Sequence, residues 1–237
     1  KLKKYKKKEM SITVSLKQDD KSIDFDIPTE WKDMTLKYWT ELSSIIRKHQ
    51  KGVELKKNSI TDQYSEDENL DNIVKDVEFL HEMHLNRDIF CYLSGLEKDD
   101  MHLVDMNKVT EVINTLGVLT EEYEPKGLKS FEFEGETYYF PSEFLKKNTY
   151  GDFIESTQLE MSIENMKNGR YDVLPEQMAI LCRRTDEKYD EDLIDEKTEK
   201  FKGLTMDVVF EFAFFLTNQN QNLLKLSSMY LEKKGNL

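Results

Sequence analysis

Two stretches of the chain have similar sequences, and this repeat limits the possible fold more than any other feature. The first stretch covers residues 25–42 (FDIPTEWKDMTLKYWTEL) and the second covers residues 139–155 (YFPSEFLKKNTYGDFIE). An internal repeat of this kind predicts two similar structural halves. With one residue inserted in the second copy, the matched pairs are Pro28 and Pro141, Glu30 and Glu143, Trp31 and Phe144, Thr35 and Thr149, Trp39 and Phe153, and Glu41 and Glu155.

Each copy follows a predicted β-hairpin. Residues 11–16 and 22–27 alternate polar and apolar side chains around a polar turn, which is typical of two strands with one buried face. Residues 130–133 and 137–140 flank Gly135, and we expect this glycine to take the strained position of a tight turn.

Helical spacing of apolar residues follows each hairpin. In the first half it predicts a helix from Thr35 to about Ile46, then helices at 70–85, 88–93 and 104–119. In the second half it predicts helices at 149–163, 176–182 and 204–217, and a last helix through Leu223, Leu226 and Tyr230. The polar residues 47–69 and the acidic residues 185–199 are interpreted as loops.

These elements predict an α+β fold that is mostly helical, with two similar halves, each a β-hairpin followed by about three helices. The predicted organisation is a Lys-rich arm at 1–10, a first half at 11–125 and a second half at 126–237, related by a pseudo-twofold internal duplication. The alternative is chance similarity between common hairpin-proline-helix patterns. The shared order of elements favours duplication.

The charge of the chain is unevenly distributed. The formal net charge is −13, yet six of the first eight residues are lysine, so the rest of the chain is more acidic than this figure indicates. An acidic body repels nucleic acid and anionic membranes, and no apolar run reaches the roughly 18 residues of a membrane span. We expect DNA or an acidic protein to be contacted only through the arm, by Lys3, Lys4, Lys6, Lys7 and Lys8.

No motif selects a catalytic or metal site. His81 and His84 lie three residues apart on a predicted helix, whereas a zinc-protease helix needs histidines four residues apart and a third ligand. Cys91 and Cys182 lie in apolar runs typical of buried thiols. We therefore expect no enzyme activity, catalytic residue, metal or cofactor, with a metal-dependent enzyme using His81 and His84 as a disfavoured alternative.

Several short motifs are similar to those of a group of tailed-bacteriophage proteins. They are residues 27–39 (IPTEWKDMTLKYW), 88–96 (DIFCYLSGL), 135–138 (GETY), 150–155 (YGDFIE) and 174–181 (LPEQMAIL), followed by an aromatic C-terminal helix. That group is associated with tail or virion morphogenesis, and some of its members are labelled tail assembly chaperones. The resemblance implies no catalytic residue, and it does not include the Lys-rich start or the long acidic loop.

The resemblance implies a virion structural protein of the neck, tail or capsid, located in the virion and, during assembly, in the host cytoplasm. Its expected partners are other phage structural proteins, bound through apolar helix faces. The alternatives are an intracellular tail assembly chaperone that the virion does not retain, and an acidic inhibitor of a host protein. The candidate binding residues are the aromatic side chains of Trp31, Trp39, Phe144, Phe153, Phe214 and Phe215.

Overall fold

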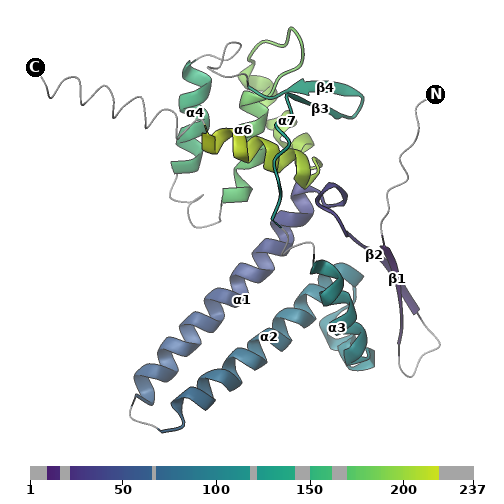
Figure 1. Cartoon of the computed structure of the whole chain (residues 1–237), viewed down its shortest axis with the longest axis vertical. Coiled ribbons are helices and arrows are strands. Elements are labelled where there is room, and N and C mark those ends of the chain that lie inside the picture. Colours follow the sequence, from purple (N-terminus) through teal and green to yellow (C-terminus); the bar gives the residue numbers. More distant parts are fainter. Residues whose placement is uncertain are drawn as a thin grey trace, which may run out of the picture. The chain divides into compact units, whose positions relative to one another are not determined.

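The fold was described from a computed structural model, which covers residues 10–16, 22–65, 68–117, 122–141, 150–161 and 170–218. The chain divides into two compact units, and Figure 1 shows their elements. Unit 1 contains Lys1–Met34 and Tyr38–Glu121, and unit 2 contains Thr35–Lys37 and Glu122–Leu237. The described part is mostly helical with two small antiparallel sheets, which confirms the predicted α+β class.

Unit 1 begins with the predicted first hairpin. Strand β1 (Met10–Ser15) pairs with β2 (Ser22–Ile27) in a register that places Met10 opposite Ile27 and Ser15 opposite Ser22. Ile12 and Val14 of β1 and Phe25 and Ile27 of β2 are buried, because alternate side chains point to the same face of a strand. The predicted alternation is therefore confirmed.

Two long helices follow the 3-10 turn η1 (Trp31–Asp33). Helix α1 (Leu36–Gln63) and helix α2 (Leu70–Ser94) run in opposite directions in Figure 1, and Lys57 of α1 bonds Glu78 of α2 at 2.5 Å. The prediction of a loop at 47–69 is wrong for 47–63, where lysine, glutamate and glutamine are good helix formers. The predicted helices at 70–85 and 88–93 are one continuous helix.

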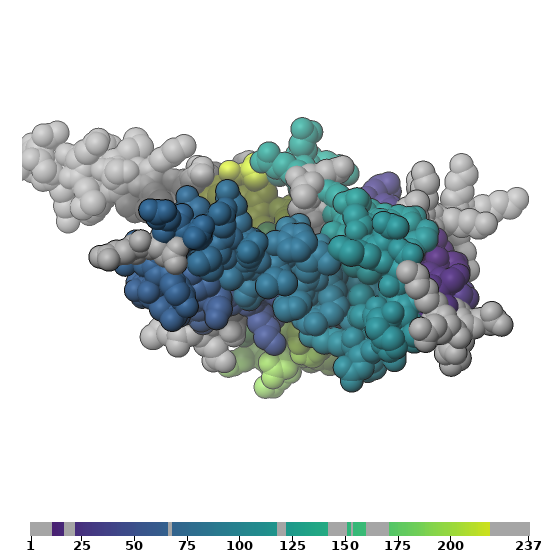
Figure 2. Space-filling view, turned by 90° about the horizontal axis from the view of Figure 1, so that it is seen from below, coloured from purple at the N-terminus to yellow at the C-terminus, as the bar shows by residue number. Residues whose placement is uncertain are grey.

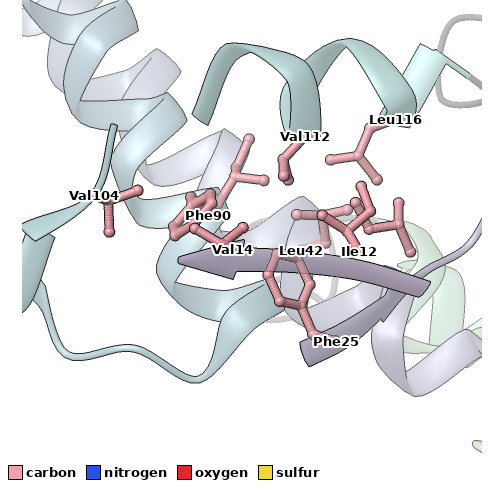
Figure 3. Close-up of a cluster of buried hydrophobic side chains, with 10 residues drawn as sticks. Ile12, Val14, Phe25, Leu42, Phe90, Val104, Val112 and Leu116 are labelled. Carbon is pink, nitrogen blue, oxygen red and sulfur yellow. The ribbon is translucent and has the colours of Figure 1, made fainter. Parts of the chain in front are cut away.

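The sheet, α1, α2 and α3 share one hydrophobic core. Helix α2 ends at Gly95, which takes the left-handed conformation with φ 70°. The chain then passes through η2 (Lys98–Leu103) into α3 (Met106–Thr115). Figure 3 shows side chains of the sheet facing those of α3, with Leu42 of α1 and Phe90 of α2 between them. The buried cluster is Ile12, Val14, Phe25, Ile27, Leu42, Ile89, Phe90, Val104, Val112 and Leu116.

Unit 2 contains the second predicted hairpin. Strands β3 (Ser130–Phe133) and β4 (Glu136–Tyr139) join through Glu134 and Gly135, whose φ angles are 50° and 82°. Two successive positive φ angles are typical of the tight turn that matches strand twist. The predicted strained position of Gly135 is therefore confirmed. Tyr139 also pairs with Arg183 through two backbone hydrogen bonds of 2.8 and 3.2 Å.

Helix α6 (Leu174–Leu181) is the central helix of unit 2. It packs against α4 (Tyr150–Met161) and α7 (Ile194–Phe201), and all of its residues except Glu176 are buried. Pro175 occupies the first turn, as predicted. A short 3-10 turn, η5 (Arg170–Asp172), precedes α6, and a last described helix covers residues 206–218.

The acidic segment predicted as a loop at 185–199 contains η6 (Glu191–Leu193) and most of α7. The loop prediction is wrong there for a local reason. The Asp190 side chain accepts a hydrogen bond from the Asp192 N–H at 3.1 Å and so starts the turn. Ile194 and Phe201, seven residues apart, are buried on one face of α7.

Unit 2 includes three residues from early in the chain. The Leu36 N–H donates to the Leu204 carbonyl at 2.7 Å, and the Lys37 N–H donates to the Lys202 carbonyl at 2.9 Å. Thr35 and Thr205 form an isolated antiparallel bridge. The first turn of α1 therefore belongs to unit 2.

Candidate protein-binding surfaces

The helix at 206–218 presents an aromatic stripe. Phe210 and Phe214 are four residues apart and so lie on one face of the helix. Phe214 is 47% exposed, and Phe210 is half-buried. The Phe210 ring stacks on Tyr123, with ring centroids 5.2 Å apart, and meets Tyr171 edge-on at 6.4 Å. These four residues, Tyr123, Tyr171, Phe210 and Phe214, are called the aromatic stripe below.

The opposite face of the same helix holds it in unit 2. Val209, Phe212 and Leu216 are buried there at helical spacing. Phe215, which was predicted as a binding residue together with Phe214, is half-buried. Because the inner face is anchored in the core, Phe214 projects from a fixed backbone.

Glu211 holds the chain segment that carries Tyr123 against this helix. Its buried carboxylate accepts hydrogen bonds from the Lys126 N–H, from the Leu128 N–H at 3.0 Å and from the Tyr123 hydroxyl at 2.8 Å. Burial alone would raise the pKa of Glu211, but these donors and the Gly127 N–H lower the pKa below its ordinary value. The stripe thus combines segments about 90 residues apart through one charged side chain.

The two predicted tryptophans lie against each other in unit 1. Trp31 of η1 and Trp39 of α1 meet edge-on with ring centroids 5.6 Å apart, and both are half-buried. An edge-to-face pair of this kind stabilises the turn into α1. Each tryptophan is therefore exposed to a smaller fraction than Phe214.

The other predicted binding residues are not placed by the structure. Phe144 and the arm residues Lys3, Lys4, Lys6, Lys7 and Lys8 lie outside the described residues. Phe153 belongs to α4, and its side chain lies outside the described part.

His81 and His84 of α2 lie in a row of histidines that includes His49 of α1. Neighbouring ring centroids in this row are 6.5 Å apart, and His49 Nε2 lies 3.1 Å from Asp88 Oδ2. Burial tends to raise the pKa of Asp88, but hydrogen bonds from Lys98, Arg87 and His49 lower it to about 2. In the ranges that the structure describes, no three histidine, cysteine, aspartate or glutamate side chains form a metal-binding group.

The paired arginines that follow α6 are both bonded to carboxylates. Arg183 is buried and donates to Asp152 Oδ2 at 2.6 Å and to the Ile180 carbonyl at 3.1 Å. Arg184 bonds Glu187 at 3.3 Å, and with Gly135 and the start of β4 it lines a polar hollow of about 460 Å³. Arg183 therefore stabilises the interior of unit 2 through its buried hydrogen bonds.

A half-buried amine is bonded to Glu187, one of the residues that line this hollow. Lys197 of α7 donates to the Cys182 carbonyl at 2.6 Å and to Glu187 at 2.7 Å. Burial lowers the pKa of Lys197, against the opposing effect of Glu187. Burial also raises the pKa of the Cys182 thiol, which confirms the expected buried thiol. Cys91 is only half-buried, and burial raises its pKa too.

The sequence interpretation found Phe214 but missed Tyr123, Tyr171 and Phe210 as its companions. The spacing of Phe210 and Phe214 was a usable signal, because residues four apart share a helix face. Tyr123 and Tyr171 join them only through tertiary packing, which no local pattern indicates.

Within the described ranges, no helix combines the length and the apolar run that a bilayer crossing needs. Comparisons of the whole chain with protein-family models, with curated proteins and with solved structures found no match. The functional argument therefore starts from the surfaces described above.

Proposed function

We propose that this chain is a non-enzymatic protein of tailed bacteriophages that becomes part of the virion by binding other structural proteins of the particle. The observation that carries the proposal is Phe214, which is 47% exposed on a helix whose other face is anchored in unit 2. The resemblance of several short motifs to those of tail and virion morphogenesis proteins supports the phage assignment. The place of action is the virion and, during assembly, the host cytoplasm.

The chemistry of the aromatic stripe suits a protein partner. Aromatic side chains are enriched at protein interfaces, where they bury a large area and lose little rotamer freedom. Tyr123 and Tyr171 flank Phe210, so the stripe offers rings with hydroxyl groups around an apolar centre. The basic arm would add a second contact, to DNA or to an acidic protein.

We also infer that the two halves arose by duplication. Each unit contains a pair of antiparallel strands, consecutive in the chain, that is followed by helices. The hairpins differ in strand length and the following helices differ in length, so the units have diverged.

The alternative function is an assembly chaperone that binds the same partner transiently. Mass spectrometry of gradient-banded phage particles, beside the infected-cell lysate, separates the two. The proposal predicts recovery in the particles at a fixed copy number. Abundance in the lysate with absence from the particles would favour the chaperone, and absence from both would overturn the phage assignment.

The role of the stripe is tested by Phe214→Ser in the same particles. We expect the variant to fold and to be lost from the particles, because the exposed ring no longer fills its partner's pocket. Leu193→Ser is the matched control, since Leu193 is 51% exposed elsewhere in unit 2. Incorporation of Phe214→Ser at the wild-type level would show that the stripe is not the binding surface.

A further inference from the structure

The part of the α1–α2 hairpin most distant from the sheet buries few of its own apolar residues. Residues 44–63 and 70–88 are all described, and Ile60 is the only one of them that is buried. In Figure 1 these parts of the two helices extend past α3 and the β1–β2 sheet of the same unit. A pair of helices that shares so little buried surface gains little stability from its packing.

Both helices nevertheless carry the apolar spacing of a helical bundle. Helix α2 repeats Leu70, Ile73, Val77 and Leu80 at intervals of three and four residues, and α1 has Ile46, Val53 and Ile60 at intervals of seven. Such spacing places one apolar stripe on each helix. Leu80 belongs to this stripe and is 55% exposed, and its neighbour Phe79 is exposed as well.

The two helices have opposite charge. Residues 47–57 of α1 have a net positive charge, from five basic residues (Arg47, Lys48, Lys51, Lys56 and Lys57) and one acidic residue (Glu54). Residues 71–82 of α2 have a net negative charge, from four acidic residues (Asp71, Asp76, Glu78 and Glu82) and one basic residue (Lys75). Lys57 and Glu78 pair within the hairpin at 2.5 Å. Lys48, Lys56, Asp76 and Glu82 are exposed, and Figure 2 shows the α1–α2 hairpin in blue.

We propose that residues 44–63 and 70–88 form a self-association surface through which two copies of the chain make an antiparallel four-helix bundle. A twofold axis places the basic α1 of one copy against the acidic α2 of its partner, and the reverse contact follows by symmetry. The exposed Leu80 and the half-buried Ile73 and Val77 become the centre of the bundle.

The charge pattern favours a second copy over an unrelated protein. One hairpin carries both the basic and the acidic surface, so it is complementary to itself, and the apolar stripe lies with them. Binding of an unrelated protein would require only one charged surface on the hairpin, either the basic or the acidic one. This dimer is independent of the binding role proposed for the aromatic stripe, because the two surfaces share no residue.

The first test is sedimentation equilibrium of the full chain at micromolar concentrations. We expect a monomer–dimer equilibrium. Leu80→Ser should weaken the dimer by about tenfold or more, because it removes an apolar contact at the centre. Met106→Ser is the matched control, since Met106 is 57% exposed on α3 outside the proposed surface, and it should leave the equilibrium unchanged. A chain that stays monomeric at 100 µM or above would overturn the proposal, as would equal effects of the two variants.

The second test reverses the charges of one helix at a time. The variant K48E/K51E/K56E changes the net charge of residues 47–57 from +4 to −2, so that both helices are acidic, and the variant D76K/E82K changes that of residues 71–82 from −3 to +1, so that both are basic. Each should lose self-association, because like charges then face each other, while circular dichroism should show unchanged helicity. An equimolar mixture of the two should recover a heterodimer, in which acidic helices face basic ones at both contacts, and added salt should weaken it.

A mixture that fails to associate would overturn the proposal, as would single variants that dimerise like the wild type. If the chain does not self-associate but its hairpin binds a different protein, the surface is a binding site for that protein and the dimer proposal is wrong.

Discussion

Arg183 and Asp152 form a buried ion pair whose loss should be costly. The two side chains are 10% and 4% exposed, and their closest atoms are 2.6 Å apart. Arg183→Met removes the ion pair and leaves the Asp152 carboxylate buried, so we expect the free energy of unfolding to fall by about 3–5 kcal/mol.

Urea unfolding measures this loss, and Arg184→Met is the matched control. Arg184 pairs with Glu187 at the surface, where an ion pair contributes about 1 kcal/mol or less. Similar losses in both variants would show that the Arg183 pair is no more important than a surface contact.

Glu211 predicts a dependence of stability on pH. Its folded-state pKa lies below the ordinary value of about 4.5, so ionised Glu211 stabilises the fold above that pH. This contribution is lost as the pH falls from the ordinary value through the folded-state pKa. Glu211→Gln should cost about 1–3 kcal/mol at pH 7, because a neutral amide accepts the same N–H groups less strongly.

The test compares urea unfolding of the wild type and of Glu211→Gln at pH 7 and at pH 4 or below. The difference between the two proteins should shrink at the lower pH, where Glu211 is partly protonated. A constant difference at both pH values would contradict the role assigned to the charge.

At the scale of single helices, replacing two glycines by alanine should change the free energy of unfolding in opposite directions. Gly52 lies inside α1, and an added Cβ would meet His81 Cε1 at 3.5 Å, which is an ordinary contact distance. Gly52→Ala should therefore raise the unfolding free energy by about 0.5–1 kcal/mol through helix propensity. Gly95→Ala should lower it by about 1 kcal/mol, because a Cβ strains the φ of 70° that ends α2.

Thermal unfolding of the two variants and the wild type checks this pair. If both variants shift the unfolding temperature in the same direction, one of the two backbone arguments is wrong.

Elements with strong local signals could be predicted from the sequence. The alternation of Ile12 and Val14 with polar residues correctly predicted the first hairpin. Gly135 correctly indicated the tight turn, and Pro175 correctly indicated the first turn of α6. The second half of α1 was missed because its lysines, glutamates and glutamines suit both a polar loop and an exposed helix. The candidate site was predicted only at Phe214. The contact of Tyr123 with Glu211 depends on packing between distant residues, which no spacing rule predicts.

At the scale of the whole molecule, unit 2 is not a continuous piece of chain. It needs Thr35–Lys37 in addition to the residues from Glu122 onward. A fragment of residues 122–237 lacks the Leu36 and Lys37 N–H groups that bond Leu204 and Lys202. It also lacks Leu36, which is fully buried. We expect this fragment to unfold at a lower temperature than the same unit in the full chain.

A peptide of residues 33–40 should bind the fragment and raise its unfolding temperature, whereas the same peptide with Leu36→Asp should not. Isothermal titration and thermal unfolding measure both effects. A fragment that is fully stable alone, and indifferent to the peptide, would contradict the assignment of these three residues to unit 2.

The early position of Thr35–Lys37 also has a consequence for synthesis on the ribosome. These residues are made roughly 165 positions before Lys202 and Leu204, which at ordinary translation rates is an interval on the order of ten seconds or more. Unit 2 therefore cannot complete its fold until its last strands and helices emerge and capture a segment made much earlier. Emergence of residues 202–204 from the ribosome, rather than the folding of each half in turn, sets the earliest time at which this unit closes.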